Sequence, residues 1–166
     1  LTPGEDYIAA LIDDGQTLSR VDICAEAWNA GRRPRGDLFS HWKTVVPEPN
    51  ATKRAFVDDE VLMNLLRRLS DAEQPQRIAF RFVLMLILMR KKLLRYDRTD
   101  KRPITDESGA QVTQEWWVLT PKLDLSKGPM GKWHDSETIE VLDPHLDDEQ
   151  IRGVTDQLGE ILNAEL

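Results

Sequence analysis

Eight consecutive apolar residues, FVLMLILM at positions 82–89, constrain the fold of this chain more than any other feature. As a helix they would extend only about 12 Å at 1.5 Å per residue, whereas a transmembrane helix needs about 20 predominantly apolar residues. Because apolar side chains surround this helix instead of forming one stripe, other parts of the chain must cover it on nearly all sides. The sequence therefore predicts a central core helix and no membrane partner.

The residues before this stretch predict that it belongs to a helical hairpin. Asp58 can cap a first helix, and the leucines at positions 62, 65, 66 and 69 recur at helical spacing on one face of it. The second helix has Pro75 near its first turn, where proline is tolerated, and is predicted to run to about Leu94. We expect the two helices to lie antiparallel.

The N-terminal residues have the pattern of a β-hairpin. Residues 7–12 and 18–23 flank the sequence DDGQ, in which Asp14-Gly15 is a strong turn signal because both residues tolerate positive φ. A short helix is expected over residues 24–30, because they are good helix formers and Gly31 follows them. Residues 39–46 are expected to be extended.

The C-terminal third is predicted to form a small sheet followed by a helix. Residues 114–120 and 137–142 are rich in aromatic and β-branched types, and a third strand is expected near residues 93–98. The segments 100–110 and 127–135 are predicted to be loops. Asp147 then begins a final amphipathic helix, in a capping box with Gln150.

Together these elements predict an α+β protein with two domains. Residues 1–50 are expected to form a small β-hairpin lobe with a short helix. Residues 51–166 are expected to hold the helical hairpin, the antiparallel sheet and the C-terminal helix.

The charge of the chain is unevenly distributed. A net charge of -7 argues against a mainly electrostatic grip on nucleic acid, yet residues 90–102 contain seven basic residues and only two acidic ones. The negative end of a helix dipole can account for the basic residues at positions 90–92. The helix dipole does not account for the basic residues at positions 95–102. Together with nearby aromatic residues, these could bind an acidic protein or an RNA backbone.

We therefore expect two partner-binding clusters of arginine and aromatic residues. The first consists of Arg95, Tyr96, Arg98, Lys101, Arg102, Trp116 and Trp117. The second consists of Arg32, Arg33 and Arg35, close in sequence to Trp28 and Trp42.

The sequence lacks the paired motifs that announce a metal or catalytic site. Cys24 and the three histidines form no pair such as Cys-x-x-Cys, so no metal site is expected. There is no phosphate-binding glycine loop and no nucleophile elbow, so no cofactor and no enzymatic activity are expected. A single cysteine excludes an internal disulfide and favours a reducing compartment, the cytoplasm.

Several blocks of sequence together resemble an uncharacterised family of bacterial proteins with no known activity. They are PGEDY (3–7), RVD (20–22), EAW (26–28), HWKTVVP (41–47), VDDEVL (57–62), FRFVLMLILMRKKLL (80–94) and DPHLDDEQI (143–151). The resemblance implies an N-terminal lobe similar to a zinc ribbon. In this chain the ribbon would be degenerate, because Ala27 stands where a partner for Cys24 would be expected.

These observations predict a non-enzymatic accessory or adaptor protein that binds another macromolecule, in the first place a protein, through its tryptophan and arginine surfaces. The alternative is a nucleic-acid-binding or ribosome-associated factor that uses the segment Arg90 to Arg102. A third alternative is an enzyme whose site is assembled from residues scattered along the sequence. The sequence does not predict the oligomeric state.

Overall fold

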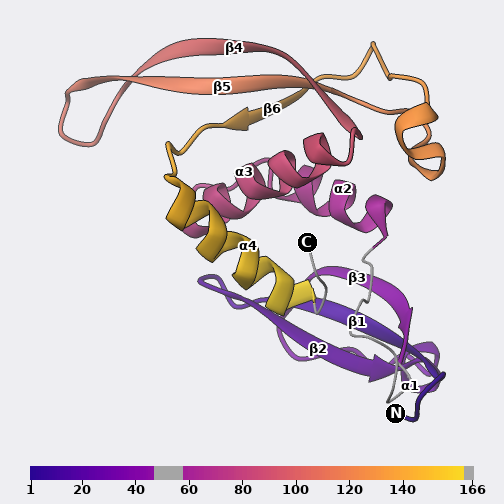
Figure 1. Cartoon of the computed structure of the whole chain (residues 1–166). Helices are drawn as coiled ribbons and strands as arrows, with labels where there is room; N and C mark the ends of the chain where they lie inside the picture. Colours follow the sequence, from indigo (N-terminus) through magenta and orange to yellow (C-terminus); the bar gives the residue numbers. More distant parts are fainter. Residues whose placement is uncertain (47–57, 163–166) are drawn as a thin grey trace. The chain divides into compact units, whose positions relative to one another are not determined.

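A computed structural model describes residues 1–46 and 58–162 of the chain (Figure 1). Within these residues, four α-helices, one 3₁₀ helix and six strands in two antiparallel sheets confirm the predicted α+β class. The chain divides into two compact units, one formed by Leu1–Val57 with Asp156–Leu166 and the other by Asp58–Thr155. The domain boundary expected between residues 50 and 51 lies outside the described residues.

The first unit contains the predicted N-terminal hairpin. Strands β1 (Asp6–Asp13) and β2 (Leu18–Cys24) pair antiparallel. The turn forms as expected, with Gly15 at a φ of 88° and Asp14 Oδ1 accepting hydrogen bonds from the backbone N–H groups of Gln16 and Thr17. The short helix α1 (Ala25–Asn29) follows β2.

The extended segment near residue 40 adds a third strand, β3 (Asp37–Val45), which gives the sheet order β2-β1-β3. The six residues of β1 from Tyr7 to Ile12 are all buried, so both faces of this central strand are covered. Within the same unit, Arg20 on β2 donates a hydrogen bond of 2.6 Å to the carbonyl oxygen of Leu162. The likeness to a zinc ribbon stays a prediction.

The second unit contains the helical hairpin. Helix α2 (Asp59–Arg68) begins after Asp58, whose carboxylate accepts a hydrogen bond from the backbone N–H of Glu60, as expected. Lys91, the residue after helix α3 (Pro75–Arg90), forms an ion pair of 2.8 Å with Asp59 at the start of α2, as expected of two antiparallel helices.

Helix α3 is the core helix that the apolar stretch predicted. Nine of its residues are buried, including Phe80, Leu84 and Leu88. Among the helices that the structure describes, none combines the length and the apolar character that a bilayer crossing requires.

The predicted end of α3 at Leu94 is wrong, because the helix stops at Arg90. Lys92 adopts a φ of 59°, and the backbone N–H groups of Leu93 and Lys92 donate to the carbonyls of Leu88 and Met89. This is the Schellman arrangement that ends a helix, here with a lysine at the left-handed position that usually holds glycine.

The second sheet comprises β4 (Leu94–Thr105), β5 (Gln111–Pro121) and β6 (Ile139–Leu142), in that order and antiparallel. The predicted loop over residues 100–110 is therefore wrong for its first half. This part of β4 is rich in charged residues, so its sequence lacks the usual composition of a strand, and pairing with β5 decides its structure. The turn itself is closed by Asp106, which accepts from the backbone N–H groups of Ser108 and Ala110.

The end of the chain contains a 3₁₀ helix, η1 (Leu125–Met130), and helix α4 (Asp148–Leu162). The segment expected to be a loop over residues 127–135 thus includes the last turn of η1. The predicted capping box is confirmed, since Asp147 Oδ1 accepts from the backbone N–H of Gln150 at 2.8 Å and Gln150 Oε1 accepts from that of Asp147 at 2.9 Å.

Candidate functional site

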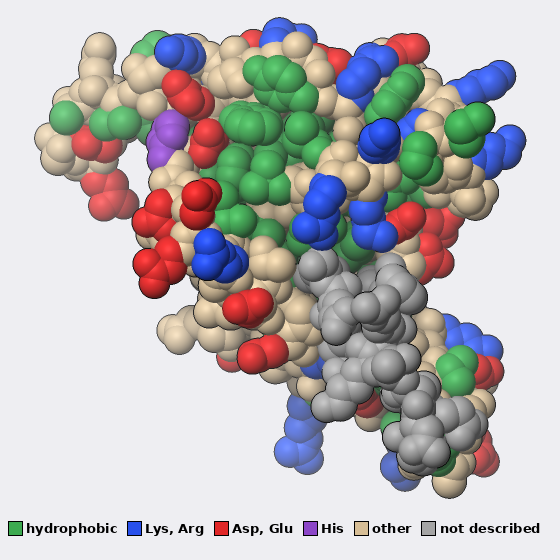
Figure 2. All heavy atoms as spheres, viewed as in Figure 1, with side chains coloured by type: hydrophobic (Ala, Val, Ile, Leu, Met, Phe, Trp, Pro, Cys, Tyr) green, Lys and Arg blue, Asp and Glu red, His purple; other side chains and the backbone are tan. Residues whose placement is uncertain are grey.

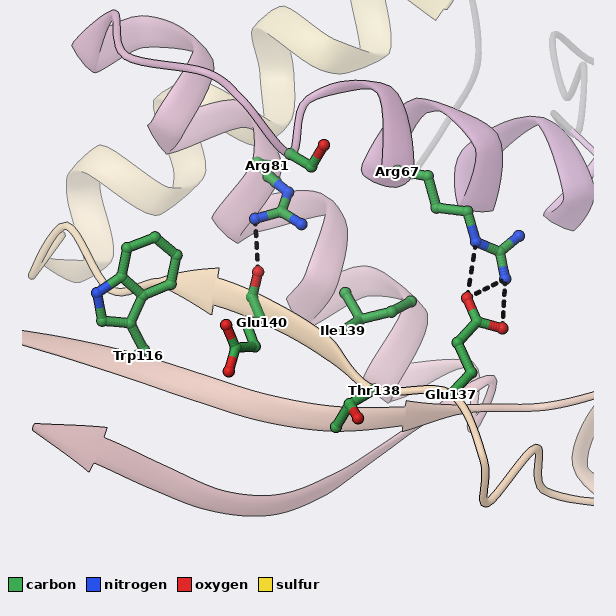
Figure 3. A pocket seen from close by; sticks show the side chains of 8 residues that line it. Arg67, Arg81, Trp116, Glu137, Thr138, Ile139 and Glu140 are labelled. Atoms are coloured by element: carbon green, nitrogen blue, oxygen red, sulfur yellow. Dashed lines mark hydrogen bonds and ion pairs between the residues drawn. The ribbon is translucent and has the colours of Figure 1, made fainter.

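The candidate site is a cleft of about 530 Å³ in the second unit, beside β6 (Figure 3). Helices α2 and α3, strand β5 and the segment that leads into β6 all contribute to it. The lining residues are Arg67, Ser70, Arg81, Trp116, Glu137, Thr138, Ile139 and Glu140.

Arg81 is the most unusual residue of the cleft, because its side chain is charged and yet only 7% of the residue's surface is exposed. Its Nε donates a hydrogen bond of 3.0 Å to the carbonyl oxygen of Leu66, and its Nη1 donates one of 2.6 Å to that of Glu140. The Leu66 carbonyl belongs to the last turn of α2, where carbonyls lack partners within the helix. Arg81 therefore joins α2 and β6 to α3.

Burial lowers the pKa of Arg81 below the ordinary value of an arginine, because removal from water disfavours the charged form. The negative charges of Asp71 and Glu140 act in the opposite direction and are the smaller effects. The guanidinium nevertheless keeps its charge at neutral pH.

Each of the other charges of the cleft has an ion-pair partner. Arg67 donates to both carboxylate oxygens of Glu137, at 3.0 and 3.3 Å, as Figure 3 shows. Glu140 accepts a hydrogen bond of 2.6 Å from Arg102 on β4. The guanidinium of Arg102 also lies 5.0 Å from the centre of the Trp116 ring, a cation–π distance.

The predicted basic surface on β4 is largely neutralised by neighbouring carboxylates. Each of its four cations has a partner, and the pairs are Arg95 with Asp97 and Asp135, Arg98 with Asp100, Lys101 with Glu115, and Arg102 with Glu140 and Asp100. Asp97 and Asp100 lie on β4 itself, two positions from their partners. Glu115, Asp135 and Glu140 come from other parts of the chain. The local excess of positive charge in the sequence is therefore not an excess in space.

The two predicted tryptophans face opposite sides of β5, because neighbouring residues of a strand alternate. Trp116 lines the cleft, whereas the ring of Trp117 packs edge-on against Phe82 of α3, with centroids 5.6 Å apart. Tyr96 lies edge-on to Trp117 at 5.3 Å. The structure thus brings together Arg102 with Trp116 and Tyr96 with Trp117, as two separate groups.

The second predicted cluster lies in the first unit, in the loop after α1. The guanidinium of Arg33 lies 3.9 Å from the centre of the Trp28 ring and donates to the Trp28 carbonyl at 2.8 Å. The Trp28 ring lies 4.8 Å from that of His41. Arg32 and Arg35 lie in the same exposed loop.

Hydrophobic side chains gather on one face of the second unit. Figures 1 and 2 show the protein from the same side, and the hydrophobic side chains of Figure 2 lie in the region of β6 and α3. Acidic side chains and a histidine border this region on one side, and basic side chains border it on the other. Tyr96 is the exposed aromatic residue of this unit, with 44% of its surface accessible.

Sequence reasoning missed two features that the fold assembles. Arg81 had no signal in the sequence beyond a single charge just before an apolar run.

The second feature is a group of possible metal ligands. Glu115, Asp143 and His145 bring three possible metal-ligand atoms within 4.8 Å of one another. Trp117 Nε1 donates to the Asp143 carboxylate at 3.2 Å. No local motif could have revealed this group, since Glu115 is 28 positions from Asp143.

The fold and the cleft define an α+β chain with two small antiparallel sheets and a polar cleft beside the short edge strand of the second. Comparison of the chain with protein families, with curated proteins and with solved structures finds no match.

Proposed function

We propose that this chain is a non-enzymatic accessory or adaptor protein that binds another protein through its second unit. The observation that carries the proposal is the gathering of hydrophobic side chains on one face of that unit, with opposite charges on its two sides (Figure 2). Such apolar areas bordered by polar residues are typical of protein interaction sites. Charge of both signs at the border would fix the orientation of a partner with the complementary arrangement.

The aromatic group next to α3 supports the same proposal. Tyr96 is exposed and is held in place by its contact with Trp117, and Trp117 in turn contacts the buried Phe82. A rigid aromatic side chain loses little conformational freedom on binding, which is why tyrosine and tryptophan are enriched among residues that dominate interface energies. We propose Tyr96 as an anchor for the partner.

The charge pairs on β4 favour a protein partner over nucleic acid. A phosphate backbone would have to compete with the carboxylates that already neutralise Arg95, Arg98 and Arg102. The net charge of -7 opposes the approach of a polyanion as well. Cys24, as the single cysteine, keeps the cytoplasm as the compartment that we propose.

Photo-crosslinking in the native cells tests this function. A benzophenone amino acid at position 96 should crosslink to a defined protein, whereas the same group at position 112 should not. Val112 is the matched control because it is equally exposed, at 44%, and lies near the far end of the β4–β5 hairpin.

The Tyr96→Ser variant should lose the complex and Val112→Ser should retain it. A chain that is recovered only as a free monomer would contradict the proposal. Recovery of RNA that dissociates steeply with added salt would replace it with the nucleic-acid alternative.

A further inference from the structure

The cleft beside β6 has a chemistry that a protein-docking face does not explain. We propose that it binds a carboxylate group that carries a small apolar substituent, with Arg81 as the recognising residue. This inference goes beyond the proposed function and does not depend on it.

Arg81 lines the cleft and has unused hydrogen-bonding capacity there. A guanidinium carries five N–H donors, and the two hydrogen bonds to backbone carbonyls engage Nε and Nη1. Figure 3 shows the remaining terminal nitrogen pointing away from the Glu140 carbonyl, toward the side of the cleft where Ile139 lies. A planar acceptor that enters the cleft can therefore meet donors that are already fixed in place.

Among the residues that the structure describes, the ion pairs around the cleft leave Arg81 without a carboxylate in direct contact. Within the described part of the chain, Arg67 is bonded to Glu137 and Arg102 to Glu140, while the hydrogen bonds of Arg81 go to carbonyl groups. Asp71 and Glu140 offset only part of the effect of burial on this charge, so a bound anion in direct contact would stabilise it further. Because Glu137 and Glu140 line the same cleft, a monoanion such as a carboxylate fits better than a phosphate dianion.

An apolar recess next to Arg81 defines the substituent. This second cavity, of about 30 Å³, shares Ser70, Arg81 and Trp116 with the cleft. Its other walls are mainly apolar and include Leu69, Ile78, Val141 and Leu142. A volume of this size accepts about one methyl group, so an alanine-like carboxylate would place its methyl group in the recess and its charge on Arg81.

Two sources present this chemistry, a free N-acylated amino acid and the C-terminus of a peptide chain. The probes are therefore N-acetyl-L-alanine and a hexapeptide that ends in alanine, each compared with its C-terminal amide. Binding is followed by the NMR signal of the Arg81 Nε–H group and by tryptophan fluorescence. Both carboxylates should shift the Arg81 signal and both amides should not.

The relative affinities of the two acids identify the source. Equal affinity indicates that a free small carboxylate is sufficient, and an affinity for the peptide that is at least about tenfold higher indicates a chain terminus. If acid and amide bind alike, or if neither acid moves the Arg81 signal, the proposal is overturned.

Two variants test the role of Arg81 without removing it, since Arg81→Met could fail to fold. Ser70→Asp places a competing carboxylate in the cleft, and it should weaken binding of both acids by about tenfold and raise the unfolding temperature. Asn64→Asp adds the same charge to α2 outside the cleft and should change neither. Equal behaviour of the two variants would show that net charge alone governs binding, and would contradict the proposal.

Discussion

Arg102 and Glu140 form a hydrogen-bonded ion pair across the width of the second sheet. Nη2 of Arg102 on β4 lies 2.6 Å from Oε1 of Glu140 on β6, and β5 runs between the two strands. Positions 102 and 140 are 38 residues apart in the chain. The pair shows how a segment that is basic in sequence becomes neutral in the folded protein.

The exposure of this pair sets its contribution to stability. A double-mutant cycle with Arg102→Gln and Glu140→Gln, measured by urea denaturation, should give the small favourable coupling free energy that is typical of an exposed ion pair. The same cycle for Lys101 and Glu115 should give nearly zero, because their charged atoms are 3.7 Å apart and the lysine side chain is 72% exposed. A coupling for the first pair as large as that of a buried ion pair would contradict this assignment.

The end of α3 predicts a stabilising substitution. Lys92 occupies the left-handed region, with a φ of 59°, where a side chain costs about 1 kcal/mol or more and glycine does not. Part of this gain is lost because glycine makes the unfolded chain more flexible. Lys92→Gly should therefore raise the free energy of unfolding by about 0.5 kcal/mol. Lys92→Ala removes the same charge but keeps the strain, so a gain in that variant would contradict the explanation.

The burial of α3 predicts a contrast between two neighbouring leucines. Leu84 is fully buried, and Leu84→Ala should lower the free energy of unfolding by about 2–5 kcal/mol. Leu86 is half-buried, so Leu86→Ala should cost clearly less. Thermal and urea denaturation measure both values. Equal costs would mean that the helix lacks the packing described above.

The bond between Thr120 and Asp97 predicts a pH-dependent effect. The Thr120 hydroxyl donates to the Asp97 carboxylate, and this bond is the main reason why the pKa of Asp97 is lowered. Because the folded-state pKa lies below the unfolded value of about 3.9, the stabilisation is complete above that pH and is lost as the pH falls through the folded value. Thr120→Val should cost about 1 kcal/mol at pH 7 and progressively less under acid.

A second threonine serves as the control for this pH dependence. The hydroxyl of Thr155 donates to the carbonyl oxygen of Ile151, which does not titrate. The cost of Thr155→Val should therefore be the same at every pH in the series. If the cost of Thr120→Val were equally constant, the bond to Asp97 could not be the cause of the lowered pKa.

Features that depend on residues close together in the chain were predictable from the sequence. The capping box of Asp147 with Gln150 spans three positions, and the turn at Asp14 is closed by bonds over two and three positions. The length and character of the stretch 82–89 were enough to predict a buried helix, because hydrophobic burial is not directional. Local hydrogen bonds and apolar patterns therefore determined the α+β class and most of the elements.

Features that depend on partners far along the chain were decided by the tertiary structure alone. The continuation of β4 to Thr105 rests on its pairing with β5, and the neutralisation of its arginines rests partly on Asp135 and Glu140. Arg81 acquires its role only when α2 and β6 bring two carbonyl groups to it. Electrostatic and hydrogen-bond interactions act over a few ångströms in space, so their outcome follows from which residues the fold brings together and not from their spacing in the sequence.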